Sequence, residues 1–170
     1  RHRDLVVGLE FGRAAAALDA FEDHLRRHIE DEETLVLPLY ASRVYPPPRG
    51  GRVEFFREEH RRLLALLEVL RREAHALAAD LGAGRRKAHE FLELESRLLH
   101  LLDHHETRER GILYRELDGR VGAEEAAAVL ARCNRRSPGA PSLGPDSRNL
   151  THPGADSCAR AASGERLPPV

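Results

Sequence analysis

A histidine and a glutamate interrupt the apolar face of a predicted helix near residues 25–38. Positions that recur every three or four residues form one face of an α-helix. On that face lie Phe21, Leu25, His28, Glu32, Leu35 and Leu39. His28 and Glu32 are about one turn apart, with ~6 Å of rise between them. An ionised carboxylate in a protein core is unfavourable unless it is paired or bound to a metal, so the fold must satisfy this pair.

The same pair recurs in residues 102–114, which align with the first stretch without a gap. His105 falls on His28, and Glu109 falls on Glu32. Imidazole and carboxylate groups are ligands for iron, manganese and zinc. Two buried His-x-x-x-Glu pairs on two helices therefore predict a metal site between them.

Composition favours an all-α fold. The chain has 170 residues, 41% of them hydrophobic and only 5% aromatic. Ala, Leu, Arg and Glu dominate, and all four are good helix formers. The apolar positions alternate at intervals of three and four, as expected for helices that pack at a shallow angle in a bundle. We predict an antiparallel four-helix bundle.

The helix boundaries follow from glycine, proline and the apolar periodicity. The predicted helical segments are 1–7, 13–40, 53–81 and 85–117, with a short Ala-rich segment at 123–132. Residues 46–51 and 82–84 are predicted loops. The inward positions are Phe56, His60, Leu63, Leu67, Leu70, Ala74, Leu77 and Leu81 on the third segment, and Leu94, Leu98, Leu101, His105, Glu109 and Ile112 on the fourth.

The first predicted segment is too short to cover one side of the bundle, so we expect a truncated first helix and self-association through the exposed face. The bundle is predicted to span residues 1–133. Residues 134–170 are rich in Pro, Ser, Gly and Arg and have no apolar periodicity. We therefore predict a disordered tail there.

His60 is the third histidine expected in the core. It lies nearly as far before the turn at Ala83 as His105 lies after it. In an antiparallel hairpin such residues reach the same height and face each other. A single buried histidine is usually hydrogen-bonded to a carbonyl or carboxylate. Three histidines and two glutamates at one level are difficult to bury without a metal.

These motifs resemble the hemerythrin-like, or HHE cation-binding, domain family over residues 1–118. The match comprises His28 and Glu32, then Glu59-His60, then His105 and Glu109 followed by Ile112-Leu113-Tyr114. The resemblance implies a four-helix bundle that holds two non-haem iron ions. It assigns the ligands His28, Glu32, His60, His105 and Glu109; manganese or zinc also suits this ligand set.

Two features depart from the family pattern. The family's first helix contributes a histidine, and the alternatives are His2 or a residue upstream of Arg1. The oxygen-carrying members have further ligands at the positions of Leu64 and Arg110. A dedicated oxygen carrier is therefore not expected. Tyr114, one turn beyond Glu109, either donates a hydrogen bond to the site or simply packs beside it.

Three functions remain open at this stage. The first is a di-iron protein that binds or senses dioxygen, nitric oxide or peroxide, or handles iron. The second is a di-iron enzyme that reduces peroxide or nitric oxide or repairs iron–sulfur clusters. The third is a metal-free structural bundle.

The expected partner is a small oxidant rather than a macromolecule. The formal net charge of −1 gives no attraction to nucleic acid. No apolar run reaches the ~20 residues of a membrane span. Two cysteines, Cys133 and Cys158, make no disulfide framework. We therefore expect a reducing, cytoplasmic compartment.

Overall fold

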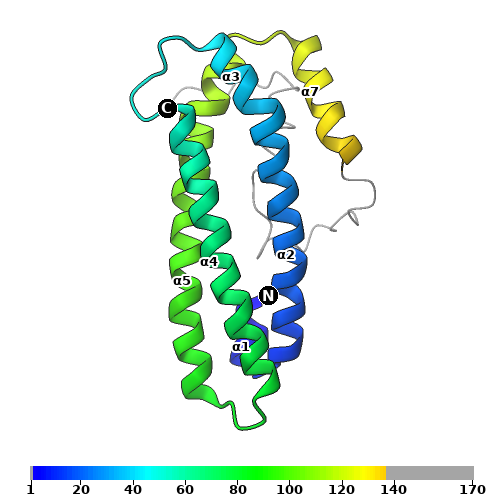
Figure 1. Ribbon diagram of the computed structural model, residues 1–170, viewed down its shortest axis with the longest axis vertical. Coiled ribbons are helices and arrows are strands. Elements are labelled where there is room, and N and C mark those ends of the chain that lie inside the picture. Colours follow the sequence, from blue (N-terminus) through cyan, green and yellow to red (C-terminus); the bar gives the residue numbers. More distant parts are fainter. Residues whose placement is uncertain (1, 137–170) are drawn as a thin grey trace, which may run out of the picture.

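The described part of the chain is a helical bundle. The computed structural model describes residues 2–136, of which 84% are helical and none lies in a strand (Figure 1). The all-α prediction is confirmed. The predicted disordered tail lies outside the described residues, except that residues 134–136 belong to the last helix.

The helices follow one another through short connections. They are α1 (His2–Val7), α2 (Phe11–Asp31), the π-helical segment η1 (Glu32–Val36), α3 (Leu37–Arg43), α4 (Val53–Ala79), α5 (Arg85–Arg108), the π-helical segment η2 (Glu109–Tyr114), α6 (Arg115–Asp118) and α7 (Ala123–Arg136). The segments α2, η1 and α3 are continuous, as are α5, η2 and α6. The predicted loops at 46–51 and 82–84 are present.

Three long helical rods form the body of the molecule. α2 packs against α4, and α4 packs against α5. The short α1 contacts both α2 and α5 at one end of the bundle (Figure 1). The bundle prediction is therefore confirmed, whereas a complete four-helix arrangement with a truncated first helix stays a prediction. Among residues 2–136, no helix has the length and apolar character that a membrane crossing requires.

Two apolar clusters divide the core along its length. The lower cluster includes Leu25 and Ile29 of α2, Leu63 of α4 and Leu98 of α5. The upper cluster is built mainly from Val36, Leu37, Tyr40, Phe56 and Leu113. Glu32, His60, His105 and Glu109 fall between the two clusters on their rods. The bundle thus has a polar layer with apolar packing on both sides.

The predicted inward positions are wrong by one residue after the start of each π-helical segment. Tyr40 is fully buried where Leu39 was expected, and Leu113 where Ile112 was expected. A π turn takes up one more residue than an α turn. It therefore displaces the buried positions that follow by one place.

The other corrections concern helix ends and one face of α5. α2 begins at Phe11 rather than Arg13, and its rod continues to Arg43 rather than ending at Tyr40. α4 ends at Ala79, which leaves Leu81 fully exposed in the turn. On α5, Phe91 and Glu95 are buried although neither was predicted to face inward, whereas the predicted Leu94 and Leu101 are only partly buried.

Gly51 gives a test of how closely the α3–α4 loop packs. A Cβ at this position would lie 2.5 Å from the Tyr40 hydroxyl oxygen and 2.9 Å from Ile112 Cγ2. We expect Gly51→Ala to lower the free energy of unfolding by about 1–3 kcal/mol, because the packing must shift.

The matched control is Gly12→Ala, in the exposed first turn of α2, where an added Cβ meets nothing within 4 Å. That variant should be neutral or more stable by up to about 1 kcal/mol. Urea unfolding followed by far-UV circular dichroism measures both. Equal stabilities for the two variants would contradict the close packing of this loop.

Candidate metal centre

The two rods that carry a His-x-x-x-Glu pair each change their helical geometry at a predicted ligand. η1 begins at Glu32 and η2 begins at Glu109. In η1 the Leu37 N–H donates to the Glu32 carbonyl, five residues back. Pro38 has no N–H for the next α-helical bond, which favours the wider turn. Gly111 lies inside η2, and glycine tolerates an altered backbone because it has no Cβ. Such π segments are frequent at functional sites.

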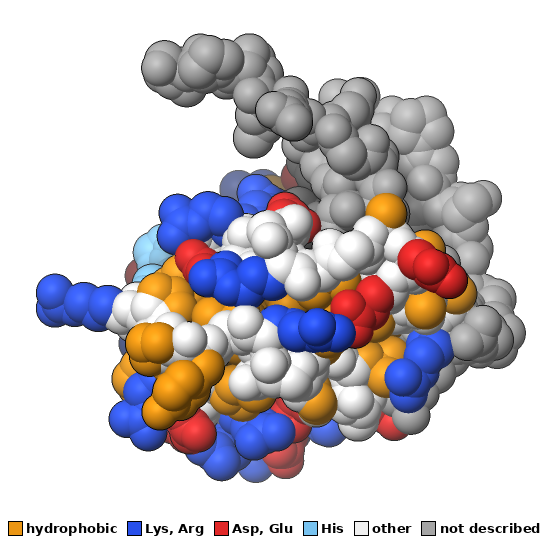
Figure 2. Space-filling model, turned by 90° about the horizontal axis from the view of Figure 1, so that it is seen from above, with side chains coloured by type: hydrophobic (Ala, Val, Ile, Leu, Met, Phe, Trp, Pro, Cys, Tyr) orange, Lys and Arg blue, Asp and Glu red, His pale blue; other side chains and the backbone are white. Residues whose placement is uncertain are grey.

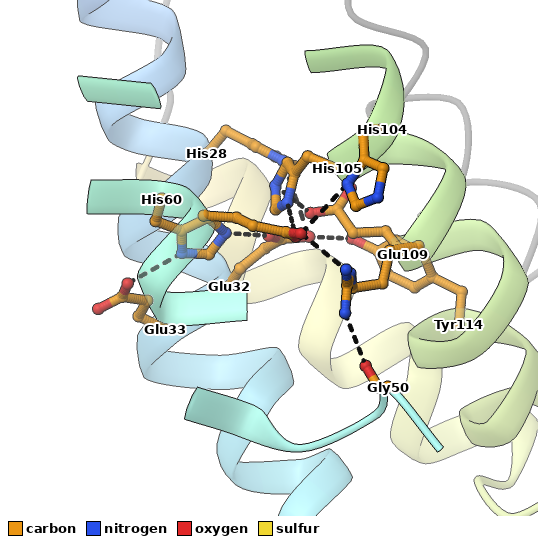
Figure 3. Close-up of polar contacts among 11 residues, drawn as sticks. His28, Glu32, Glu33, Gly50, His60, His104, His105, Glu109 and Tyr114 are labelled. Carbon is orange, nitrogen blue, oxygen red and sulfur yellow. Dashed lines mark hydrogen bonds and ion pairs between the residues drawn. The ribbon is translucent and has the colours of Figure 1, made fainter. Parts of the chain in front are cut away.

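Four buried side chains converge in the polar layer. One donor atom from each of Glu32, His60, His105 and Glu109 lies within 4.8 Å of the others. His105 Nε2 is 2.7 Å from Glu109 Oε1, and His60 Nε2 is 3.2 Å from Glu32 Oε2. The two imidazole rings meet edge to face, with centroids 4.8 Å apart. The predicted encounter of His60 with His105 is therefore present (Figure 3).

The converging atoms are short of hydrogen bonds. His60 Nε2, His105 Nε2, Glu32 Oε2 and both carboxylate oxygens of Glu109 are buried without a hydrogen bond of acceptable geometry. The contacts between them are short, but the angles are not those of donor and acceptor. Buried polar groups in native proteins are nearly always satisfied. A cation at the common focus of these atoms would satisfy them together.

Both histidines are held from behind by a carboxylate. His60 Nδ1 lies 2.9 Å from Glu33 Oε1, and His105 Nδ1 lies 3.1 Å from Glu59 Oε2. When Nδ1–H donates to the carboxylate, the lone pair of Nε2 faces the centre. Metal-binding histidines are typically oriented in this way. The sequence analysis assigned no role to these carboxylates, although each adjoins a predicted ligand in the sequence.

Tyr114 donates a hydrogen bond from its hydroxyl to Glu32 Oε1. This settles the alternative left open by the sequence in favour of a hydrogen bond to the site. The two oxygens of Glu32 therefore have different partners: Oε1 accepts from Tyr114, and Oε2 faces His60. Tyr114 comes from η2 and Glu32 from η1, so the bond joins the two π segments (Figure 3).

His28 lies at the edge of the centre. Its side chain is 16% exposed, and its Nε2 is 3.7 Å from Glu32 Oε1. The structure therefore places this predicted ligand beside the four converging residues rather than among them.

His2 is fully buried but lies elsewhere. Its Nδ1 is 2.6 Å from Glu95 Oε1, and its ring packs against Phe91. Glu95 precedes His105 by almost three turns, roughly 15 Å along the helix axis. The structure does not bring His2 to the centre, because α1 is short and turns back into α2 after Val7.

Two further positions agree with the departure from the oxygen carriers. Leu64 packs partly buried against the lower apolar cluster. Arg110 is half exposed and pairs with Glu106. Neither side chain is among the four that converge.

Electrostatics make the centre hold protons when no metal is bound. Burial raises the pKa of Glu109 to about 8, and the charge of Glu32 adds to the effect. Burial would lower the pKa of His105, but its close contacts with the Glu109 and Glu59 carboxylates raise it to about 10. Burial disfavours ionisation of Glu32, but the charges of His28 and His60, both close to its carboxylate, lower its pKa. The centre thus keeps a proton on Glu109 near neutral pH.

The donor set limits the chemistry available. Imidazole nitrogens and carboxylate oxygens, without a thiolate, suit iron, manganese or zinc rather than a soft-metal or iron–sulfur site. The two carboxylates carry four oxygens, so more than one cation can be bound. A hydroxyl group and two carboxylates already support the ligands from outside.

Comparison with known proteins agrees with this geometry. Residues 52–135 match the family model of the hemerythrin HHE cation binding domain. The match contains His60, His105 and Glu109, whereas His28 and Glu32 precede it. No curated protein and no solved structure matched the chain. The family resemblance seen in the motifs is confirmed, and residues 52–135 are the part of this chain that carries the hemerythrin HHE cation binding domain.

Proposed function

We propose that this chain is a non-haem di-iron protein that binds or senses a small oxidant such as dioxygen, nitric oxide or peroxide. The ligands proposed are His28, Glu32, His60, His105 and Glu109. The observation that carries the proposal is the convergence of two imidazole Nε2 atoms, each held at Nδ1 by a carboxylate, on two buried carboxylates.

A metal-free structural layer fits this arrangement poorly. An unsatisfied buried polar group disfavours folding by about 1–3 kcal/mol. Five such atoms from four residues face one another here. A purely structural layer would be expected to arrange them as donor–acceptor pairs. The inward lone pairs of both histidines instead suit a cation.

The protein's own groups define what such a site can do. Iron held by these imidazole and carboxylate groups would supply a redox-active centre for binding dioxygen, peroxide or nitric oxide. Glu32 and Glu109 each offer two oxygens and so can bind two ions. The Tyr114 hydroxyl holds one oxygen of Glu32, which orients the other towards His60. The apolar clusters above and below exclude water from the layer.

The first prediction concerns metal content. Protein expressed in iron-replete cells should contain two iron ions per chain by elemental analysis. Anaerobic reduced protein should change its visible absorption on exposure to dioxygen or nitric oxide. The proposal would be refuted if the purified protein contained less than about half an equivalent of any transition metal per chain.

The second prediction concerns the carboxylates. Glu32→Ala and Glu109→Ala should each lose iron while keeping the helical far-UV spectrum. The reason is that the helical fold depends on apolar packing, whereas iron binding depends on the charged carboxylates. The matched control is Glu22→Ala, which removes a buried carboxylate of α2 that pairs with Arg26 and Arg71. That variant should retain its iron. Wild-type iron content in both site variants would show that these carboxylates are not ligands.

The third prediction concerns the pH dependence of the metal-free protein. Glu109 and His105 hold their protons more tightly when folded than when unfolded, where their pKa values are about 4.5 and 6.5. The stability that this binding contributes is therefore lost as pH rises towards about 8 for Glu109 and about 10 for His105. Between pH 6.5 and 9 the free energy of unfolding should fall by about 3–5 kcal/mol.

Urea unfolding of metal-free protein at these two pH values measures this fall. Glu109→Gln removes one titrating group with little change of shape, so its fall should be smaller. Glu32 has a lowered pKa and contributes stability above its unfolded value of 4.5, so it does not change in this interval. A wild-type stability that is constant or rises from pH 6.5 to 9 would contradict the electrostatic account.

A further inference from the structure

We infer that Arg108 is a positioning residue of the metal centre. Its guanidinium group fixes the Glu59 carboxylate, which orients His105, and connects that carboxylate to the α3–α4 loop. This inference rests on the proposed function, because it takes His105 as a metal ligand. The contacts of the Arg108 guanidinium group are with Glu59, Gly50 and Phe55. It acts through Glu59.

Glu59 is a buried carboxylate with three cationic or proton-bearing neighbours. It is 7% exposed. Its Oε2 accepts from His105 Nδ1 at 3.1 Å. Its Oε1 lies 3.0 Å from Arg108 Nε and 3.3 Å from the Nδ1 of the exposed His104. One oxygen therefore serves the predicted ligand, and the other forms an ion pair with the guanidinium group.

The guanidinium group of Arg108 is fixed on two further sides. One terminal nitrogen donates to the Gly50 carbonyl at 3.1 Å. The group also lies over the Phe55 ring, 5.8 Å from its centroid. The side chain is only 22% exposed. Figure 3 shows the chain of contacts from the loop at Gly50 towards the centre.

The loop to which Arg108 is anchored is itself tightly placed. Gly50 has a φ of +81°, which favours glycine. Gly51 lies against Tyr40 and Ile112, without room for a Cβ. The Gly50 carbonyl is thus held by the packing of the upper apolar cluster, and Arg108 carries that fixed position to Glu59.

The second histidine lacks an equally buried support. Glu33, which holds His60, is 35% exposed, whereas Glu59 is 9% exposed by the same side-chain measure. A buried carboxylate needs a counter-charge, and a guanidinium group supplies it together with several donors in a planar array. Arg108 therefore secures the His105 side of the centre, where solvent cannot compensate the charge.

The test is Co²⁺ binding to full-length metal-free protein, followed by the visible absorption that reports the ligand field. Mutation of a residue that is hydrogen-bonded to a metal ligand typically lowers metal affinity 10–100-fold. Arg108→Gln should weaken Co²⁺ binding about tenfold and shift the absorption band, and Glu59→Gln should weaken it by at least as much. The double variant should bind within about twofold of Glu59→Gln alone, because Arg108 acts through Glu59.

Arg110→Gln is the matched control, because it removes the same charge from a half-exposed position two residues away. It should bind Co²⁺ as the wild type does. Arg108→Lys keeps the charge beside Glu59 and should bind more tightly than Arg108→Gln. Should Arg108→Gln fail to fold by circular dichroism, a shifted band in Arg108→Lys is expected, and an unshifted one overturns the inference.

Wild-type affinity in Arg108→Gln would overturn the inference while leaving the metal site intact. Losses that multiply in the double variant would also overturn it, since they would show that Arg108 acts independently of Glu59. If the wild-type protein binds neither Co²⁺ nor Fe²⁺, the proposed function fails instead. The two failures are therefore distinguishable.

Discussion

The structure depends on burying two carboxylates and two imidazoles in one layer of a helical bundle. The charged forms of these groups are unfavourable in a core. Burial raises the pKa of Glu109, whereas the charges of His28 and His60 lower the pKa of Glu32 in spite of its burial. Everything close to the layer helps to satisfy them. Glu33 and Glu59 hold the imidazoles, Tyr114 holds one carboxylate, and the inward-facing atoms are left for a cation. The apolar clusters provide the folding energy that such a layer requires.

This arrangement also explains why the bundle is divided into two cores. In most small bundles a single apolar seam runs from end to end. Here the polar layer interrupts the seam on α2, α4 and α5 at the same height. The lower cluster packs α1, α2, α4 and α5 together, whereas the upper one joins α3, the start of α4 and the η2–α6 segment. The ligands are therefore fixed from both sides by packing that they do not themselves supply.

The sequence predicted the main rods and the convergence of Glu32, His60, His105 and Glu109, because apolar periodicity and a symmetric hairpin determine both. It did not predict the π segments, since widening a turn leaves no clear mark beyond a proline or a glycine. Tyr40 and Leu113 were missed for that reason. Nor did it predict the role of Arg108, because contacts to a loop that is distant in sequence depend on the tertiary fold.

The two π segments lie on neighbouring ligand rods and both start at a glutamate of the polar layer. Each π segment accommodates one extra residue in a wide turn. Because both rods have this extra residue, the buried faces of the helical segments above the layer still point towards each other. Removing a residue from one rod alone would turn its upper half by about 100° relative to the other. Insertions and deletions in residues 33–36 and 110–114 are therefore coupled: a length change tolerated in an ordinary surface helix would here separate the upper core from the ligands beneath it.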